Sequence, residues 1–96
     1  MNIQQMMKQA KKIQEQMEQA KEALSQKEFL VKKQGITVTV LGNHHIKDIN
    51  IDAALLDPDD KEIVQDIIIL AINEANDLIN EAYKLLESSN KPGAMF

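Results

Sequence analysis

The first quarter of the chain carries the pattern that most restricts the fold. Between residues 3 and 24, apolar side chains recur alternately three and four positions apart, at Ile3, Met6, Ala10, Ile13, Met17, Ala20 and Leu24. This is the a/d spacing of a coiled coil, and it predicts a helix over residues 2–25 that buries one narrow stripe against another helix. The helix that packs on this stripe can belong to the same chain or to another copy. These seven residues are termed the heptad seam.

Three lysines lie on the helix face opposite the heptad seam. Lys8, Lys11 and Lys12 fall at heptad positions f, b and c, whereas the positions that flank the seam are mostly glutamine. Surface ion pairs are expected at helical spacing, between Lys11 and Glu15 and between Glu18 and Lys21. The lysine face can serve solubility alone or can contact an acidic partner, and both interpretations stay open at this point.

Strand-like patterns replace the helical period after this segment. Residues 29–31 form a short apolar run, which ends in the polar turn sequence of residues 32–35. Residues 36–40 then alternate apolar β-branched residues with threonines, as in a half-buried strand. Two neighbouring strands joined by a short turn that contains glycine predict a β-hairpin.

A third strand is predicted over residues 45–51. Gly42 and Asn43 are assigned to the turn before it, because glycine and asparagine best tolerate positive φ. Ile46 breaks the alternation of this strand, so we expect either a bulge near it or burial of Ile46 on the second face. Together the three strands predict an antiparallel meander.

A second helix is predicted over residues 59–88. Asp57 suits the N-cap position and Pro58 the first helical position, and the acidic residues that follow favour the positive end of the helix dipole. Its apolar stripe is wider than the heptad seam, so its first half must be buried on most sides. A three-stranded sheet covers only one side, which favours a second copy on another side, as in an isologous dimer. The residues expected in the core or the dimer contact are Ile13, Met17, Ile67, Ile68, Ala71 and Ile72.

Composition limits the possible architectures and locations. A chain of 96 residues forms one small domain, assigned to residues 1–88, with residues 89–96 as a flexible tail. There is no cysteine, hence no disulfide and no thiolate metal site. The N-terminal segment has no apolar core of the kind that marks export, and no apolar run is long enough to cross a bilayer. A cytoplasmic protein without membrane contact is expected.

Charge is distributed unevenly between the two parts of the chain. The formal net charge is −4, but residues 1–34 carry seven lysines and four acids, whereas residues 35–96 carry four lysines and eleven acids. The local field therefore has two signs, and a basic N-terminal part can contact a polyanion despite the acidic total. Arginine is absent, so any phosphate contact must come from lysine.

Catalytic and metal-binding patterns are not found in the sequence. His44 and His45 are adjacent, so on a strand they would point to opposite faces, and no further histidine or cysteine completes a ligand set. The acids between Asp57 and Glu62 are explained by helix capping and match no calcium-binding loop. We expect neither an enzyme nor a cofactor, metal ion or small-molecule substrate.

Several segments resemble the YbaB/EbfC family of bacterial nucleoid-associated proteins. The segments are MMKQAKKIQEQM at residues 6–17, VLGNHHIKDINID at 40–52, LLDPDDKE at 55–62, AINEA at 71–75 and KPGAMF at 91–96. The resemblance covers nearly the whole chain, and its most specific part is the junction between the third strand and the second helix. It implies an α+β fold of the order α-β-β-β-α and a tweezers-shaped homodimer.

The resemblance also implies a function. A member of this family is expected to be cytoplasmic and nucleoid-associated and to bind double-stranded DNA with little sequence preference, altering its conformation. On this chain the predicted phosphate contacts are Lys8, Lys11 and Lys12, with Lys32 and Lys33 at the first hairpin as a second contact region. The alternative is a protein-interaction module that does not bind DNA, in which the heptad seam captures a partner helix.

Overall fold

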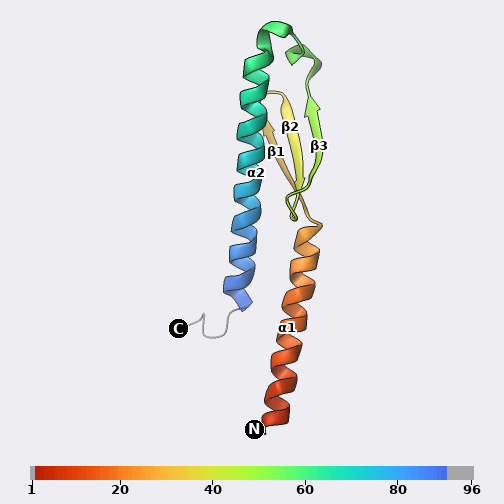
Figure 1. The fold of residues 1–96 in the computed structure, drawn as a ribbon, viewed down its shortest axis with the longest axis vertical. Coiled ribbons are helices and arrows are strands. Elements are labelled where there is room, and N and C mark those ends of the chain that lie inside the picture. The colour runs from red at the N-terminus through yellow and green to blue at the C-terminus, as the bar shows by residue number, and fades with distance from the viewer. Residues whose placement is uncertain (1, 91–96) are drawn as a thin grey trace.

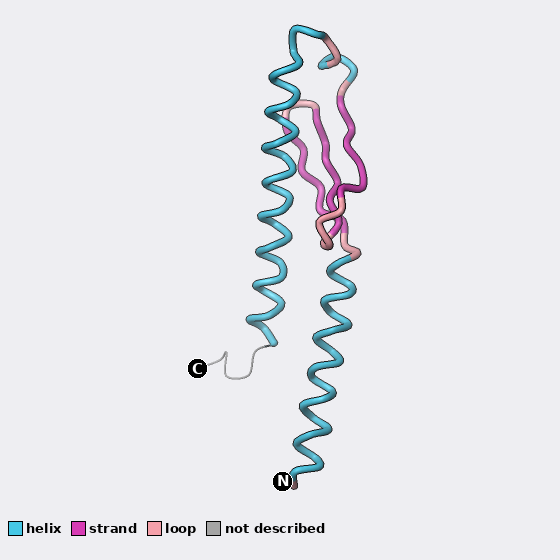
Figure 2. The backbone as a smooth tube through the Cα atoms, in the orientation of Figure 1, coloured by secondary structure: helices cyan, strands magenta, loops and turns pink. Residues whose placement is uncertain are grey.

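The computed structural model describes residues 2–90 as a helix, a three-stranded sheet and a second helix, which confirms the predicted α-β-β-β-α order (Figure 1). The elements are α1 (Ile3–Ser25), β1 (Glu28–Lys33), β2 (Ile36–Leu41), β3 (Ile46–Ile51), the short 3-10 helices η1 (Ala53–Leu55) and η2 (Pro58–Asp60), and α2 (Lys61–Asn90). Helix α2 runs the length of one sheet face and continues past the sheet, where it lies near the C-terminal half of α1 (Figure 2).

Helix α1 extends away from the rest of the molecule. Its first turn is capped by Asn2, whose side-chain Oδ1 accepts a hydrogen bond from the Gln5 N–H at 2.8 Å. The molecule measures 70 × 25 × 13 Å, and its radius of gyration is 19.6 Å. A compact chain of this length has a radius of gyration of about 12–13 Å. The N-terminal part of α1 is thus an arm, and residues 3–17 are termed the arm below.

The sheet has the order β1-β2-β3, with both pairs antiparallel. The first hairpin turns at Gln34 and Gly35, with φ of 48° and 89°, which is the two-residue turn that matches strand twist. In the second pair Val40 lies across from Ile46 while Thr39 lies across from Asp48, so one residue of β3 is unmatched. This irregularity confirms the bulge predicted near Ile46.

The second turn differs from the prediction. The residue with positive φ there is His44, at 71°, and not Gly42 or Asn43. Gly42 is required for space instead, because a Cβ at this position would lie 1.8 Å from the carbonyl oxygen of Leu24. The Gly42 N–H donates to the Lys27 carbonyl at 2.9 Å, and the Asn43 N–H donates to the Ser25 carbonyl at 3.0 Å. This turn therefore fixes the end of α1 against the sheet.

The start of α2 is also more complex than predicted. Asp57 caps the 3-10 helix η2, in which the Asp59 N–H donates to Asp57 Oδ1 at 2.9 Å, and α2 itself begins at Lys61. Proline at the first position of η2 favours this tight turn because its φ is preset. At the other end α2 continues through Asn90, two residues beyond the predicted boundary. The rest of the predicted tail, residues 91–96, lies outside the described residues.

The core lies between α2 and the two strands β1 and β2. Its buried members are Val31, Ile36, Val38, Val40, Ile67, Ala71, Ala75 and Ile79. Of the other residues expected in the core or dimer contact, Ile68, Ile72 and Met17 are half-buried, and Ile13 is 49% exposed. The sequence predicted that the first half of α2 is buried on most sides with the help of a second copy, and this stays a prediction, because Ile63, Ile69 and Leu70 are exposed in the single chain.

The single chain exposes much more surface than a compact protein of its mass. Its accessible area is 7482 Å² for a mass of 10.8 kDa. The area expected for a compact monomer of this mass is about 5,500 Å², so the surplus is about 1,900 Å². The exposed apolar residues account for part of this surplus, and they lie on the arm, on several sides of α2 and on the edge strand β3.

Candidate nucleic-acid interface

The arm presents three lysines on one face. At 100° per residue, Lys8, Lys11 and Lys12 fall within an arc of about 100° on the side of α1 opposite the heptad seam. All three side chains are exposed. Neither Lys11–Glu15 nor Glu18–Lys21 forms an ion pair in residues 2–90, contrary to the prediction, and the three arm lysines have no ion-pair partner there. They are therefore free to contact a polyanion.

The same helix face becomes acidic beyond the arm lysines. Glu15, Glu18 and Glu22 lie on nearly the same side of α1, one to three turns further along, and all three are exposed. Charges of one sign repel a phosphate backbone as effectively as the other sign attracts it. The positive surface is thus confined to the first half of α1. The helical spacing of the three acids already indicates in the sequence where the positive surface ends, but the prediction considered only the lysines.

Several other lysines are engaged within the chain. Lys21 Nζ lies 3.6 Å from Glu87 Oε1 on α2, and Lys47 forms an ion pair with Glu28 across the sheet. The Lys27 Nζ lies 5.4 Å from the centroid of the Phe29 ring, within range of a cation–π contact. One of these contacts joins α1 to α2 and the other two are local to the sheet, so the arm lysines remain a distinct group.

Lys32 and Lys33 do not form one contact surface. They are neighbours on β1, so their side chains leave the sheet on opposite faces. Lys32 is exposed on the face away from α2, whereas Lys33 Nζ lies 3.3 Å from Glu74 Oε2 on α2. An exposed pair of this kind is worth only about 0.2–1 kcal/mol. Breaking the Lys33–Glu74 ion pair so that Lys33 contacts a phosphate therefore costs little free energy.

The arm lysines and the hairpin lysines are far apart in one chain. Helix α1 and β1 run in the same general direction (Figure 1). The helical rise from Lys12 to the end of α1 is about 20 Å, and the strand rise from Glu28 to Lys32 adds about 13 Å. A duplex that touches both groups on one chain would therefore follow the long axis of the molecule for at least about 30 Å.

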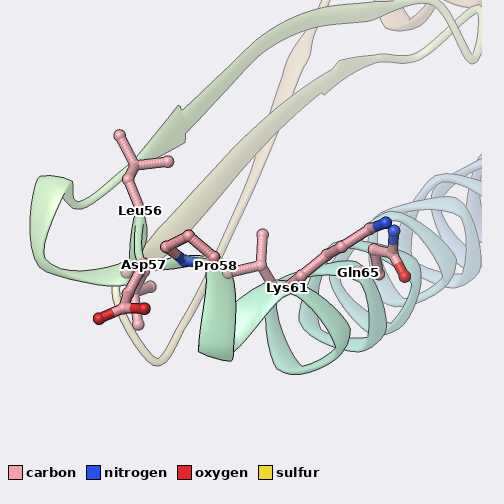
Figure 3. Close-up of a pocket in the computed structure, with 7 residues that line it drawn as sticks. Leu56, Asp57, Pro58, Lys61 and Gln65 are labelled. Atoms are coloured by element: carbon pink, nitrogen blue, oxygen red, sulfur yellow. The ribbon is translucent and has the colours of Figure 1, made fainter.

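The end of the molecule opposite the arm is acidic. Residues 52–66 contain six acids and only one lysine, Lys61. An open groove of about 390 Å³ lies here, lined by Leu55, Leu56, Asp57, Pro58, Lys61, Val64 and Gln65. In Figure 3 the carboxylate of Asp57 points away from the side chain of Lys61. The surplus of negative charge makes this end unsuitable for phosphate, which leaves the arm as the better interface.

The histidines have a structural environment. His44 Nδ1 lies 2.9 Å from Asn76 Oδ1, so the ring donates this hydrogen bond and ties the second turn to α2. Within residues 2–90, no cluster of three or more histidines and acids could hold a metal ion. In the same range neither helix is apolar over enough of its length to cross a membrane.

Comparison with known proteins identifies relatives over nearly the whole chain. The profile of the YbaB/EbfC DNA-binding family matches residues 1–86. A nucleoid-associated protein of Metamycoplasma arthritidis is 54% identical over 83 residues, which are 86% of this chain and 87% of the relative. A nucleoid-associated protein of Mycoplasmopsis pulmonis is 43% identical over 95 residues, covering 99% of this chain and 95% of the relative.

A solved structure has the same fold. The crystal structure of the uncharacterized protein HP0035 from Helicobacter pylori superposes with a TM-score of 0.72 at 24% sequence identity, over 90% of this chain and 92% of that one. At this identity the likeness concerns the fold alone.

Proposed function

The chain belongs to the YbaB/EbfC DNA-binding family, and on this premise we propose that it is a nucleoid-associated protein that binds duplex DNA as a homodimer, mainly through lysine–phosphate contacts. The observation that carries the proposal is the group of three unpaired, exposed lysines on the arm. Lys32 and Lys33 form the second contact region. Contacts of this kind position a protein on DNA without reading its sequence, so little base preference is expected.

The lysine chemistry supports contacts to phosphate and not to bases. The chain has no arginine, the residue that most often grips guanine through two hydrogen bonds. Among residues 2–90, the two aromatic residues offer no platform for stacked bases, because Phe29 and Tyr83 are half-buried against the core. Lysine acts as a compact point charge, which suits a backbone whose charge is the same for every sequence.

We place the homodimer contact on the side of the α2–sheet layer where β3 lies. Helix α2 covers β1 and β2, but leaves Ile46 and Ile49 of β3 partly exposed, at 49% and 39%. On the helix, Ile69 is exposed and Ile72 half-buried on the side that carries the His44 contact, next to β3. The surplus surface of about 1,900 Å² per chain, part of which lies on the arm, is large enough to include an interface on this flank.

The test measures duplex binding as a function of salt. Three arm lysines per chain give six phosphate contacts per dimer, which contribute about −5 to the slope of log K against log salt. Replacing Lys8, Lys11 and Lys12 together by glutamine should weaken binding at low salt and remove most of this slope. The matched control replaces Lys47, Lys61 and Lys84 by glutamine, which changes the net charge equally but leaves the arm intact.

Each result discriminates between the two functions. Equal losses in both variants would mean that binding follows net charge and would contradict the assignment to the arm. An unchanged slope in the arm variant would contradict it as well. If the unmodified protein binds no duplex at micromolar concentration and moderate salt, the DNA-binding proposal is wrong, and the interaction module that uses the heptad seam is favoured.

A further inference from the structure

The arm carries an apolar face that the chain leaves uncovered. Ile3 is 75% exposed, and Met6 and Ile13 are about half exposed. Toward the sheet the situation changes: Ala20 and Leu24 are half-buried, and together with Ala82 and Leu86 of α2 they line an open groove of about 420 Å³ between the two helices. The part of the heptad seam from Ile3 to Ile13 thus has the spacing of a packing surface and stays exposed in the single chain, whereas Met17 is already half-buried. The homodimer flank described above lies on the sheet layer and does not include this face.

We propose that the arms of two copies bound to different duplexes pair through their heptad seams, so that the protein bridges DNA. This inference rests on the proposed function, because the lysines on the opposite face of the arm hold the duplexes. The occupant of the seam is a second copy of the same arm. The a/d spacing is specific for a helical partner, since it keeps one narrow stripe in contact with another helix.

The residues that flank the seam fit pairing between identical helices. Flanking e and g positions decide partner choice in coiled coils through their charges. On the arm these positions are Met7, Gln9, Gln14 and Gln16, none of which is charged. Two identical arms therefore meet without like-charge contacts. A partner helix with charged e and g positions would find no ion-pair partner on this surface.

The geometry of the arm links seam pairing to bridging. The arm lysines lie on the helix side opposite the seam, so pairing two seams turns the two lysine faces outward in opposite directions. One pair of arms then presents two separate phosphate-binding surfaces, and a duplex on one side leaves the other side free. The arm is also preformed as part of α1, which is anchored at Gly42 and Asn43.

The short length of the arm makes pairing dependent on DNA. Residues 3–17 cover two heptads, or about 21 Å of helix, which is marginal for independent association. Copies bound along neighbouring duplexes are held at a high effective concentration, and this converts weak pairing into stable bridging. The free protein at micromolar concentration should accordingly show no pairing of arms between dimers.

A crosslinking experiment tests the pairing directly. The chain has no cysteine, so a single substitution gives a unique site. Ala10→Cys places a thiol in the seam, and Glu15→Cys places one on the opposite side of the same helix. With duplex DNA and a mild oxidant, the first variant should crosslink at least tenfold more than the second, and its crosslinking should fall at least tenfold without DNA. Equal crosslinking of the two variants, or equal crosslinking with and without DNA, would overturn the inference.

A capture experiment tests bridging. A duplex fixed on beads is incubated with protein and then with a second, fluorescent duplex. The double variant Met6→Gln, Ile13→Gln should bind a single duplex within about twofold of the unmodified protein and lose at least tenfold of the captured fluorescence. The matched control Leu30→Gln removes an exposed apolar side chain from the sheet and should capture normally.

The two proposals fail in different ways in this assay. Binding to one duplex without capture of the second overturns bridging and leaves the DNA-binding function intact. Capture that survives the double seam variant likewise overturns the role of the seam. Absence of binding to any single duplex overturns the proposed function and, with it, the bridging that depends on it.

Discussion

Replacing Gly42 by alanine should destabilise the protein by several kcal/mol, although the change adds only one methyl group. The new Cβ would lie 1.8 Å from the Leu24 carbonyl oxygen and 2.7 Å from the Leu24 carbonyl carbon. These atoms belong to backbone at the end of α1, so no side chain can rotate away. Ordinary contact would require the turn and the helix end to separate by about 1.5 Å.

The magnitude follows from two costs. Forcing an extra methyl group into a packed site costs about 1–3 kcal/mol. The same displacement stretches the hydrogen bonds from Gly42 to Lys27 and from Asn43 to Ser25, which are worth about 1 kcal/mol each. The sum is about 3–5 kcal/mol, a large part of the 5–15 kcal/mol by which small domains are usually stable.

Urea unfolding at a fixed protein concentration measures this loss, because the stability of a dimer depends on concentration. The control Tyr83→Phe removes the hydroxyl that donates to the Gly42 carbonyl at 3.1 Å and adds no atom. It should cost only about 1 kcal/mol. A Gly42→Ala protein within about 0.5 kcal/mol of the unmodified one would refute the steric argument.

Two further predictions concern the core and the dimer. Ile79→Ala creates a cavity at a fully buried position and should cost about 2–5 kcal/mol in urea unfolding, whereas Leu85→Ala at an exposed position should cost less than about 1; equal costs would contradict the description of the core. Ile49→Asp with Ile69→Asp puts charges on the flank proposed for the dimer and should yield a monomer by light scattering, and a dimer of unchanged mass would move the interface elsewhere.

The elements themselves could be read from local patterns. The three-four spacing of the heptad seam predicted α1, alternation predicted β2, and the break in alternation at Ile46 predicted the bulge, because each of these signals depends only on neighbouring residues. The capping signals at Asp57 and Pro58 located the start of the second helical segment within a few residues. They did not reveal that the 3-10 helix η2 directly precedes α2, because 3-10 helices and α-helices accept the same N-cap residues.

The candidate interface was predicted only in part. Sequence spacing placed Lys8, Lys11 and Lys12 on one helix face, and the structure describes them there without ion-pair partners. The pairing of Lys33 with Glu74 joins residues that are distant in the chain, so no local pattern could reveal it. The opposite directions of Lys32 and Lys33 follow from strand geometry, and a prediction that grouped them as one site overlooked this.

The sequence by itself determined which faces are apolar and which are charged, because periodicity assigns each side chain to a side of its helix or strand. Only the tertiary structure decided which apolar faces the chain covers itself. Helix α2 covers β1 and β2, and at the sheet-proximal end of the heptad seam it lines a groove with Ala20 and Leu24, which are half-buried. The arm remains open because the Gly42 turn directs α1 beyond the sheet, and that contact depends on backbone atoms 18 residues apart, which no local pattern encodes.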